Sequence, residues 1–197
     1  MAITYQFNKT SLQGFEKDLK MRQRTLPTLQ SKETALRLEV KRAKDEIKAL
    51  DEEVNRRIKD YDQMLALWGE FDTDLIHVDD VRMSIKKIAG VRVPVLDEVV
   101  YSTKAFNIFS SPKWFVDGFE QLKAIAEVGL RQEFVRRKVD LLEYARKKTT
   151  QKVNLFEKVQ IPGYQDAIRK IKRFMEDEEN LNKSSQKIVK GKKEAAV

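Results

Sequence analysis

The chain has 197 residues, of which 36% are charged and 41% hydrophobic, and its seven glycines and four prolines are few enough to favour long exposed helices over a compact sphere. It contains no cysteine, which excludes a disulfide framework and a zinc site built from thiolates. The formal net charge of +8 favours acidic partners, such as nucleic acid, an anionic membrane surface or an acidic protein cavity.

Residues 1–11 are expected to form a flexible N-terminus, and they lack the hydrophobic core of a signal peptide. Asn8, Thr10 and Ser11 can each cap a helix, so a helix is predicted to begin near Thr10. No run of eighteen residues in the chain is apolar, so we expect no transmembrane segment and a cytoplasmic location.

The longest pattern in the chain is an apolar heptad repeat over 12–68. The first series of repeat positions comprises Leu12, Leu19, Leu26, Glu33, Val40, Ile47, Val54, Tyr61 and Trp68. The second series, three residues later, comprises Phe15, Arg22, Leu29, Leu36, Ala43, Leu50, Arg57 and Met64. Fourteen of these seventeen positions are apolar. Alternating steps of three and four residues give a period near 3.5, which predicts one half of a coiled coil on the order of 80 Å long.

Pro27 lies inside the second heptad of this predicted helix. Because proline has no amide proton and its ring crowds the preceding turn, it costs about 3 kcal/mol in a helix interior. A kink or local break is therefore expected near 25–27. The charges along the helix are mixed rather than segregated, so we interpret them mainly as a solvated face with pairs such as Glu33 and Arg37.

Residues 69–117 depart from the helical pattern and are predicted to form a small mixed knob with short β-strands. The strand candidates are Val81, Met83 and Ile85, then Val91, Val93 and Val95, and finally the runs 99–101 and 106–109. Pro94 favours an edge position, because proline cannot donate to a central ladder. Trp114, Phe115 and Phe119 are expected to pack the knob against the end of the long helix or, alternatively, to form a binding surface.

A second long helix is predicted over 118–185. Its early repeat positions are Val135, Leu142, Thr149 and Phe156. Around Pro162 the apolar spacing restarts at Ile161, so the seam is expected to slip by about one residue there. Residues 186–197 form a basic C-terminal tail, which either is disordered or stays helical in its first half and meets an acidic collar.

The two predicted helices, 12–68 and 118–185, are separated by fewer than fifty residues, which is too short a connection to return the chain along a long rod. The predicted fold is therefore mainly α, a long antiparallel two-helix coiled coil with a small β-containing knob at the hairpin end. If Trp68 and Gly118 lie level, the numbers of facing residues add to about 186. Pro27 then lies almost level with Pro162, which suggests a bend or swivel at that height.

The residue types that carry enzyme chemistry are not arranged in a recognisable site. No glycine loop for phosphate precedes a lysine and a hydroxyl residue, and no elbow-like spacing supports a nucleophile. His77 is the only histidine, and the aspartates near it do not match calcium or zinc patterns. We therefore expect no catalytic residue, no cofactor and no metal site.

Four groups of residues carry a resemblance to a known family. They are Asn8, Lys9, Thr10, Leu12 and Leu19 near the start, Ala89, Gly90, Val91, Val93 and Pro94 in the middle, Val153, Asn154, Glu157, Ile161 and Pro162 in the second helix, and Glu176, Glu178, Lys187, Val189 and Lys190 near the end. In this order they resemble motifs of the D subunit, the central rotor shaft of V-type and archaeal-type rotary ATPases. Over 25–33 the chain departs from the family pattern. The resemblance therefore does not define the contacts of the upper part of the shaft.

The resemblance implies a non-catalytic central-stalk subunit that transmits torque between the ATP-hydrolysing or ATP-synthesising hexamer and the membrane ring that moves ions. Both termini would enter the cavity of the hexamer, between its catalytic and nucleotide-binding subunits. The knob would contact the small F subunit of the stalk and dock into the funnel-like C subunit. The location would be cytoplasmic, peripheral to the membrane through the complex.

The resemblance also selects candidate contact residues. At the hexamer end these are Asn8, Lys9, Thr10, Arg22, Arg24, Asn154, Glu157, Pro162, Lys170 and Arg173, and at the knob end they are Val91, Val93, Pro94, Trp114 and Phe115. The alternative interpretation of the charged residues among these candidates is that they form a solvated helix face. The sequence does not distinguish proton from sodium transport, or synthesis from hydrolysis.

Two other functions are compatible with parts of the pattern. A coiled-coil scaffold or tether would share the rod and would self-associate through an exposed apolar seam. A nucleic-acid-binding coiled coil would use the charge of +8, but it would favour a basic stripe with interleaved aromatic residues, which is not evident in this sequence.

Overall fold

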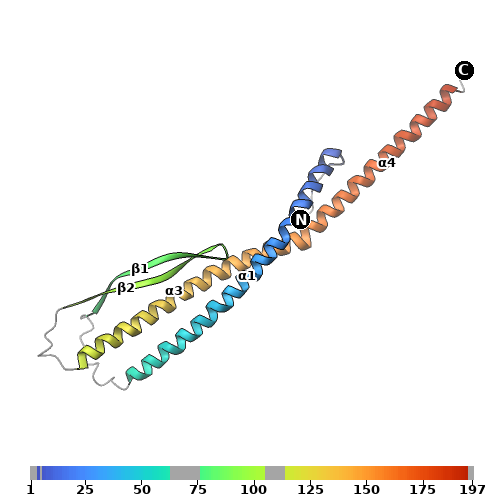
Figure 1. Cartoon of the computed structure of the whole chain (residues 1–197). Helices are drawn as coiled ribbons and strands as arrows, with labels where there is room; N and C mark the ends of the chain where they lie inside the picture. The colour runs from blue at the N-terminus through green and yellow to red at the C-terminus, as the bar shows by residue number, and fades with distance from the viewer. Residues whose placement is uncertain (1–3, 5, 63–75, 105–113, 195–197) are drawn as a thin grey trace. The chain divides into compact units, whose positions relative to one another are not determined.

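The computed structural model describes residues 4, 6–62, 76–104 and 114–194 (Figure 1). The elements in chain order are helix α1 (Lys9–Asp62), strands β1 (Ile76–Ile88) and β2 (Val91–Thr103), helix α3 (Trp114–Leu155), the π-helical segment η2 (Phe156–Gln160) and helix α4 (Ile161–Glu194). The predicted mainly helical fold with two long helices and a small β region is thereby confirmed. The chain divides into two compact units, 34–147 and 1–33 with 148–197, which we describe separately.

Helix α1 begins where the sequence predicts. Asn8 caps it, because the Asn8 Oδ1 atom accepts a hydrogen bond of 2.7 Å from the Ser11 N–H. The helix then continues through Pro27, so of the two predicted outcomes, a kink or a local break, the break is wrong, and the kink stays a prediction. Leu26 and Leu29 on either side of the proline are half-buried in the seam, and this packing offsets the one hydrogen bond that the proline removes.

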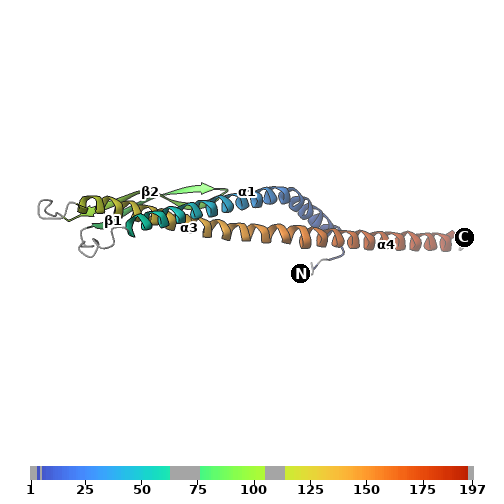
Figure 2. The same cartoon turned by 90° about the horizontal axis from the view of Figure 1, so that it is seen from below.

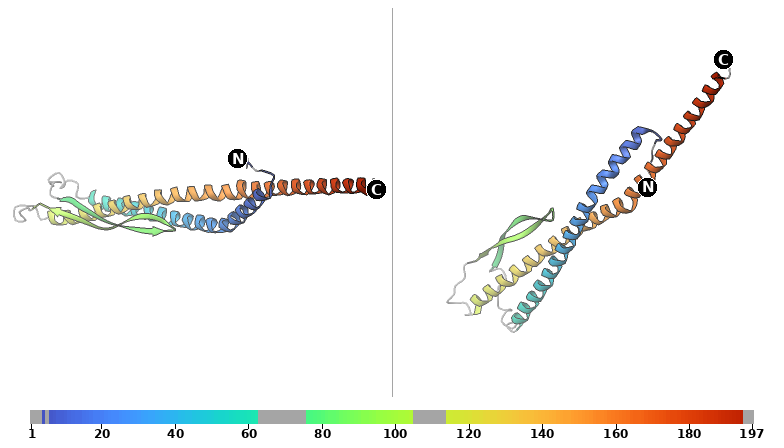
Figure 3. Two further views of the ribbon diagram at one scale, coloured as in Figure 1. Left: turned by 90° about the horizontal axis from the view of Figure 1, so that it is seen from above. Right: turned by 45° about the vertical axis from the view of Figure 1, so that its right-hand side comes forward.

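In unit 34–147, α1 and α3 pack side by side in opposite directions, as the views in Figures 1 and 3 agree. Three ion pairs join the two helices: Lys44 Nζ to Glu143 Oε1 at 2.5 Å, Lys138 Nζ to Glu46 Oε2 at 2.9 Å, and Arg136 Nη2 to Asp51 Oδ1 at 3.5 Å. As the residue number in α1 increases, the residue number of its partner in α3 decreases. The two residue numbers of each ion pair therefore add to a value close to 186. The antiparallel register predicted from the sequence is confirmed in this unit.

Strands β1 and β2 form one antiparallel hairpin of two 13-residue strands. Their two-residue turn is Ala89–Gly90, and both residues have positive φ angles, 48° and 84°. Such a turn twists in the same sense as the strands that it connects, and glycine adopts this conformation without steric cost. The strands are longer than predicted, because the separate candidate at 99–101 is the continuation of β2. The candidate at 106–109 lies outside the described residues.

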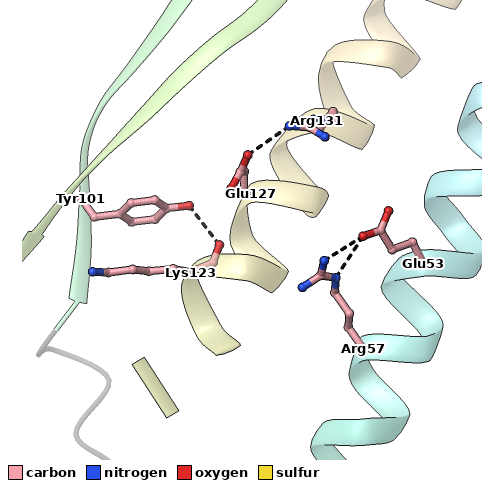
Figure 4. Close-up of polar contacts among 6 residues, drawn as sticks. All are labelled: Glu53, Arg57, Tyr101, Lys123, Glu127 and Arg131. Carbon is pink, nitrogen blue, oxygen red and sulfur yellow. Dashed lines mark hydrogen bonds and ion pairs between the residues drawn. The ribbon is translucent and has the colours of Figure 1, made fainter. Parts of the chain in front are cut away.

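The hairpin extends along the helix pair instead of remaining at its end. Val93 of β2 has no exposed surface, and it packs in one core cluster with residues from both helices. The buried members of the cluster are Leu36, Val40, Ala43, Val93, Val139 and Leu142. At the other end of the hairpin, the Tyr101 hydroxyl donates a 3.2 Å hydrogen bond to the Lys123 carbonyl of α3 (Figure 4). The sequence could not predict this placement, because strand patterns do not tell which helix face a hairpin covers.

In unit 1–33 with 148–197, the two chain segments also run antiparallel, but contacts between individual side chains replace a broad core. Phe15 packs on Tyr164 with ring centroids 5.4 Å apart, and Glu33 accepts a 3.2 Å hydrogen bond from Thr150. The buried residues of this unit are Thr149, Ala167, Ile168 and Ile171. The seam predicted from the heptads is therefore present here, but it is narrow.

The π-helical segment η2 explains the predicted slip of the seam. At its end, the Ile161 N–H donates to the Phe156 carbonyl five residues earlier, so the turn holds one residue more than an α-helical turn. The buried positions Thr149 and Ile171 are twenty-two residues apart, one more than three heptads. Pro162 follows directly, and its missing N–H removes the α-helical hydrogen bond that a regular turn would make there.

Candidate partner-binding surfaces

Arg22 is the most enclosed of the predicted hexamer-end residues, with 17% of its side chain exposed. Its Nε atom donates a 2.8 Å hydrogen bond to Gln160 Oε1, and its guanidinium carbon lies 4.5 Å from the centre of the Tyr164 ring. The Nη1 atom also pairs with Asp18 at 3.3 Å. Arg22 therefore joins α1 to η2 and α4, and its side chain serves the fold of this unit.

The other candidates on the N-terminal side differ from Arg22. Lys9, Thr10 and Arg24 are exposed, and their side chains form no hydrogen bond or ion pair among the described residues. Asn8 is exposed as well, but its amide oxygen is used by the helix cap. Lys9, Thr10 and Arg24 are thus available to a partner, whereas the role of Asn8 in this structure is to start α1.

The candidates on the C-terminal side lie along the solvated face of the second helical segment. Asn154, Glu157 and Pro162 are exposed, and Arg173 is exposed on α4. Lys170 forms a 2.9 Å ion pair with Asp166 one helical turn before it. Hydrogen bonds from Lys170 and Arg169 hold the pKa of the Asp166 carboxyl below its usual value.

The last part of α4 presents an exposed apolar stripe that the candidate residues did not include. Phe174 packs on Phe7 of the N-terminal segment, with ring centroids 4.8 Å apart. Beyond it α4 extends past the start of α1 and stays helical to Glu194 (Figures 2 and 3). Leu181 and Ile188 continue the heptad spacing from Phe174, with 69% and 60% exposed. The heptad spacing itself was the signal that could have identified this stripe.

The stripe is accompanied by positive charge. The lysines of this part of the helix are Lys183, Lys187, Lys190, Lys192 and Lys193. Lys183 pairs with Glu179 at 2.6 Å, one turn away on the same helix, and a hydrogen bond from this lysine lowers the pKa of Glu179. Five acidic residues balance these five lysines over 175–194, so the positive charge is confined to 182–193, after the acidic run 176–179. The part 182–193 thus has the properties expected of a helix that binds an apolar and acidic surface. Of the two predicted states of the tail, the helical one is observed up to Glu194.

The candidates at the knob end are distributed between the core and the surface. Val93 is fully buried, so its side chain packs the core and offers no surface to a partner. Val91 is half-buried against the same cluster, and Pro94 is half-buried on β2. Trp114 is half-buried at the start of α3, and the side chain of Phe115 lies outside the described residues. The buried aromatic residue of this group is Phe119.

The polar contacts near the ends of the helices in unit 34–147 are shown in Figure 4. Arg57 of α1 donates to Glu53 at 2.9 Å, and Arg131 of α3 donates to Glu127 at 3.0 Å, both within one helix. Burial and the nearby Glu127 carboxylate raise the pKa of the Tyr101 hydroxyl. These contacts are structural pairs, and their arrangement positions neither a nucleophile nor a general base.

Within the described residues, no group of three histidine, aspartate or glutamate side chains could hold a metal ion. The helices of this part of the chain are also too polar to cross a membrane. The residues that remain as functional candidates are surface residues of long helices and of a hairpin. The fold defines a class of protein: a mainly helical chain in which long helices pair antiparallel and one β-hairpin packs against them.

The comparisons with known proteins assign the family. A model of the family described as the D subunit of ATP synthase matches residues 11–191, so the chain belongs to this family, that of the central stalk subunits of V/A-type ATPases. The D subunit of a V-type ATP synthase from Borreliella burgdorferi is 30% identical over 185 residues, covering 92% of this chain and 91% of the relative. The corresponding D subunit of Chlamydia trachomatis serovar L2 is 26% identical, covering 98% and 97%. The chain is thus a non-catalytic stalk subunit.

Proposed function

We propose that this chain is the rotor of its ATPase and transmits torque between the nucleotide-processing hexamer and the ion-translocating ring of the membrane. The observation that carries the proposal is the antiparallel seam, which pairs the two helical segments within each compact unit. A supercoiled pair resists twisting better than a single helix does, and a rotating shaft needs such resistance. Membership of the D-subunit family supports the same role.

The hexamer end of the rotor, in this proposal, is the lysine-rich part of α4 together with the exposed residues at the start of α1. Leu181 and Ile188 present an apolar stripe with no partner among the described residues, and the residues between and after them, 182–193, carry five lysines and no acidic residue. A cavity lined by acidic and apolar residues of the catalytic and nucleotide-binding subunits would complement it. Arg24 and Arg173 extend this surface, whereas Arg22 does not, because its side chain joins the two helical segments.

The other end of the rotor is assigned to unit 34–147. Its exposed surface includes both sides of β1 and the outer residues of α3, and we propose that the small F subunit of the stalk and the funnel-like C subunit bind there. The whole complex would hold the chain on the cytoplasmic side of the membrane, peripheral to it. Val93 is excluded from this contact surface because it has no exposed area.

A rotation experiment tests the proposal. Because the chain has no cysteine, Lys87→Cys gives a single attachment point on the hairpin for a bead or gold particle. With the hexamer fixed to a surface, we expect stepwise rotation of the particle that depends on ATP. A complex that hydrolyses ATP normally while the particle stays still would contradict the rotor role.

A second experiment tests the hexamer end. Leu181→Glu together with Ile188→Glu places charge on the apolar stripe, and it should release the chain from the hexamer while circular dichroism remains unchanged. Asn182→Glu together with Gln186→Glu adds the same charge to the same exposed part of α4, away from the stripe. Assembly that is equally weakened by both pairs would assign the effect to net charge and overturn the role of the stripe.

A further inference from the structure

The outer edge of β1 is open. In the described residues β1 pairs only with β2, in a sheet of two strands. Every residue from Arg82 to Lys87 is exposed, which means that both faces of β1 are uncovered over this run. By contrast, β2 holds the contacts with the helices through Val93 and Tyr101. A long edge strand without proline is a template for pairing with another strand.

The side chains of β1 are distributed along the strand in a self-complementary pattern. Asp79 and Asp80 lie toward the beginning of the strand, and Lys86 and Lys87 lie toward its end, with Met83 midway between the two groups. Met83 is 64% exposed. Neither lysine forms an ion pair with another residue in the described part of the chain. The edge therefore carries opposite charges at its two ends and an apolar centre.

We propose that the free chain pairs with a second copy of itself through this edge, in an antiparallel β1–β1 ladder centred on Met83. In that register Asp80 of one copy lies opposite Lys86 of the other. Asp79 lies at a bulge of β1, where it has no partner residue on β2, and it adds negative charge near Lys87. Val81 lies opposite Ile85, whose side chain is 70% exposed. Opposite charges and apolar pairs that face each other across an antiparallel ladder stabilise it.

The same pattern disfavours the parallel alternative. In a parallel in-register ladder, Lys86 and Lys87 of one copy would lie beside the same lysines of the other, and the aspartates would meet likewise. Like charges placed side by side on neighbouring strands destabilise a sheet. The antiparallel arrangement has a twofold axis, so both copies use the same surface and the pairing closes at two copies.

A single added strand pairing buries much less than a standard interface, so the dimer is expected to be weak and concentration-dependent. It involves the chain outside the ATPase complex, and it is therefore independent of the proposed rotor function. Two hairpins that cover each other would protect an open edge until other subunits bind the chain. Rotation of the assembled complex and self-association of the free chain are separate measurements, so either can fail without the other.

Charge exchange provides the first test. Sedimentation equilibrium of the purified full chain should show a reversible monomer–dimer equilibrium. Lys86→Asp with Lys87→Asp should weaken the dimer by about tenfold or more, and so should Asp79→Lys with Asp80→Lys. When these two variants are mixed, opposite charges face each other again, and a dimer containing one copy of each should form.

A cysteine on the twofold axis provides the second test and leaves all four charges in place. Paired residues in an antiparallel ladder have Cα atoms about 4.5–5.5 Å apart, within the range that a disulfide spans. Met83→Cys, treated with diamide as the two-electron oxidant, should give a disulfide-linked dimer. Tyr144→Cys on α3 is the matched control, because Tyr144 is 65% exposed and Met83 is 64% exposed.

The outcomes separate the alternatives. A wild-type chain that stays monomeric up to its solubility limit would overturn the proposal, as would cross-linking that is equally fast at Met83→Cys and Tyr144→Cys. A dimer that persists in both charge variants would assign self-association to another surface, such as the stripe on α4, and would equally overturn it. Circular dichroism of each variant checks that the hairpin and helices are retained.

Discussion

The two compact units use the same pair of antiparallel chain segments, but different interactions hold them together. In unit 34–147 the helices share an apolar cluster with the hairpin, and Leu36, Leu142 and Val93 have no exposed surface. In unit 1–33 with 148–197, the largest fully buried side chain is Ile171, and much of the contact comes from Arg22 and from two aromatic pairs. A third element changes a two-helix seam into a core.

The difference shows what a two-helix seam can bury by itself. Two helices that meet without a third element leave their flanks exposed, so polar and aromatic side chains must cover the seam. The irregular turn η2 occurs in the unit with the thinner core. A π-helical turn there displaces few buried neighbours, whereas the same turn beside Leu142 would disturb the cluster that includes the hairpin.

The largest expected effect is in the three-element core. Leu142→Ala removes a side chain with no exposed surface, and it should lower the free energy of unfolding by about 2–5 kcal/mol. Trp114 begins α3 in this unit, so its fluorescence during urea unfolding follows this unit. The control is Leu141→Ala next to it, which is 43% exposed and should cost much less. Equal losses would contradict the cluster.

A somewhat smaller effect is expected from Ile171→Ala in the other unit. The side chain has no exposed surface, but the narrow seam can close over the space more easily, so we expect about 2–3 kcal/mol. Amide hydrogen exchange over 161–171 is the measurement, because Trp114 does not lie in this unit. Leu181→Ala, at 69% exposed, should leave the exchange unchanged. A loss as large as that of Leu142→Ala would mean that the two cores are equivalent.

Arg22 tests whether polar contacts replace the apolar core in the thinner unit. Arg22→Ala removes the hydrogen bond to Gln160 and the stacking on Tyr164, and it should lower stability by about 1–2 kcal/mol. Arg22→Lys should recover little, because lysine lacks the planar guanidinium. Thermal unfolding followed by circular dichroism measures the change. Arg24→Ala is the control, and an equal shift from both substitutions would contradict the structural role of Arg22.

The smallest effect concerns pH. A hydrogen bond and the charge of Lys44, together with Arg146, lower the pKa of Glu143 from its usual 4.5. The resulting stabilisation is fully present above pH 4.5 and is lost as the pH falls through the lower folded-state pKa. Because the Glu143 side chain is 38% exposed, the gain is small. Lys44→Gln should raise the pKa of Glu143 in an NMR titration, and Lys41→Gln should not.

The sequence predicted the features that depend on residue spacing along the helices. The two heptad series identified the buried stripe of α1, since their described members up to Arg57 are buried or half-buried. The residue spacing near Pro162 predicted a slip in the seam, and η2 provides it. The predictions were accurate here because helical periodicity is a local property that side-chain spacing records directly.

The individual candidate residues were harder to predict. Arg22 and Arg24 are both arginines of the same helix, but only Arg22 meets Gln160 and Tyr164. Val93 matched a family motif, and the structure places it in the core. The side on which a partner segment lies cannot be deduced from spacing, because contacts between distant segments depend on where each element packs.

The sequence by itself determined that the chain forms long helices with a repeating apolar seam, that they return antiparallel, and that a small β region separates them. Local periodicity and the short connection are sufficient for those conclusions. Only the tertiary structure decided that the hairpin is packed along the helix pair, that Pro27 is tolerated, and that β1 has no second strand beside it among the described residues. These features depend on which distant surfaces meet, and burial of apolar area between distant surfaces is a property of the whole fold.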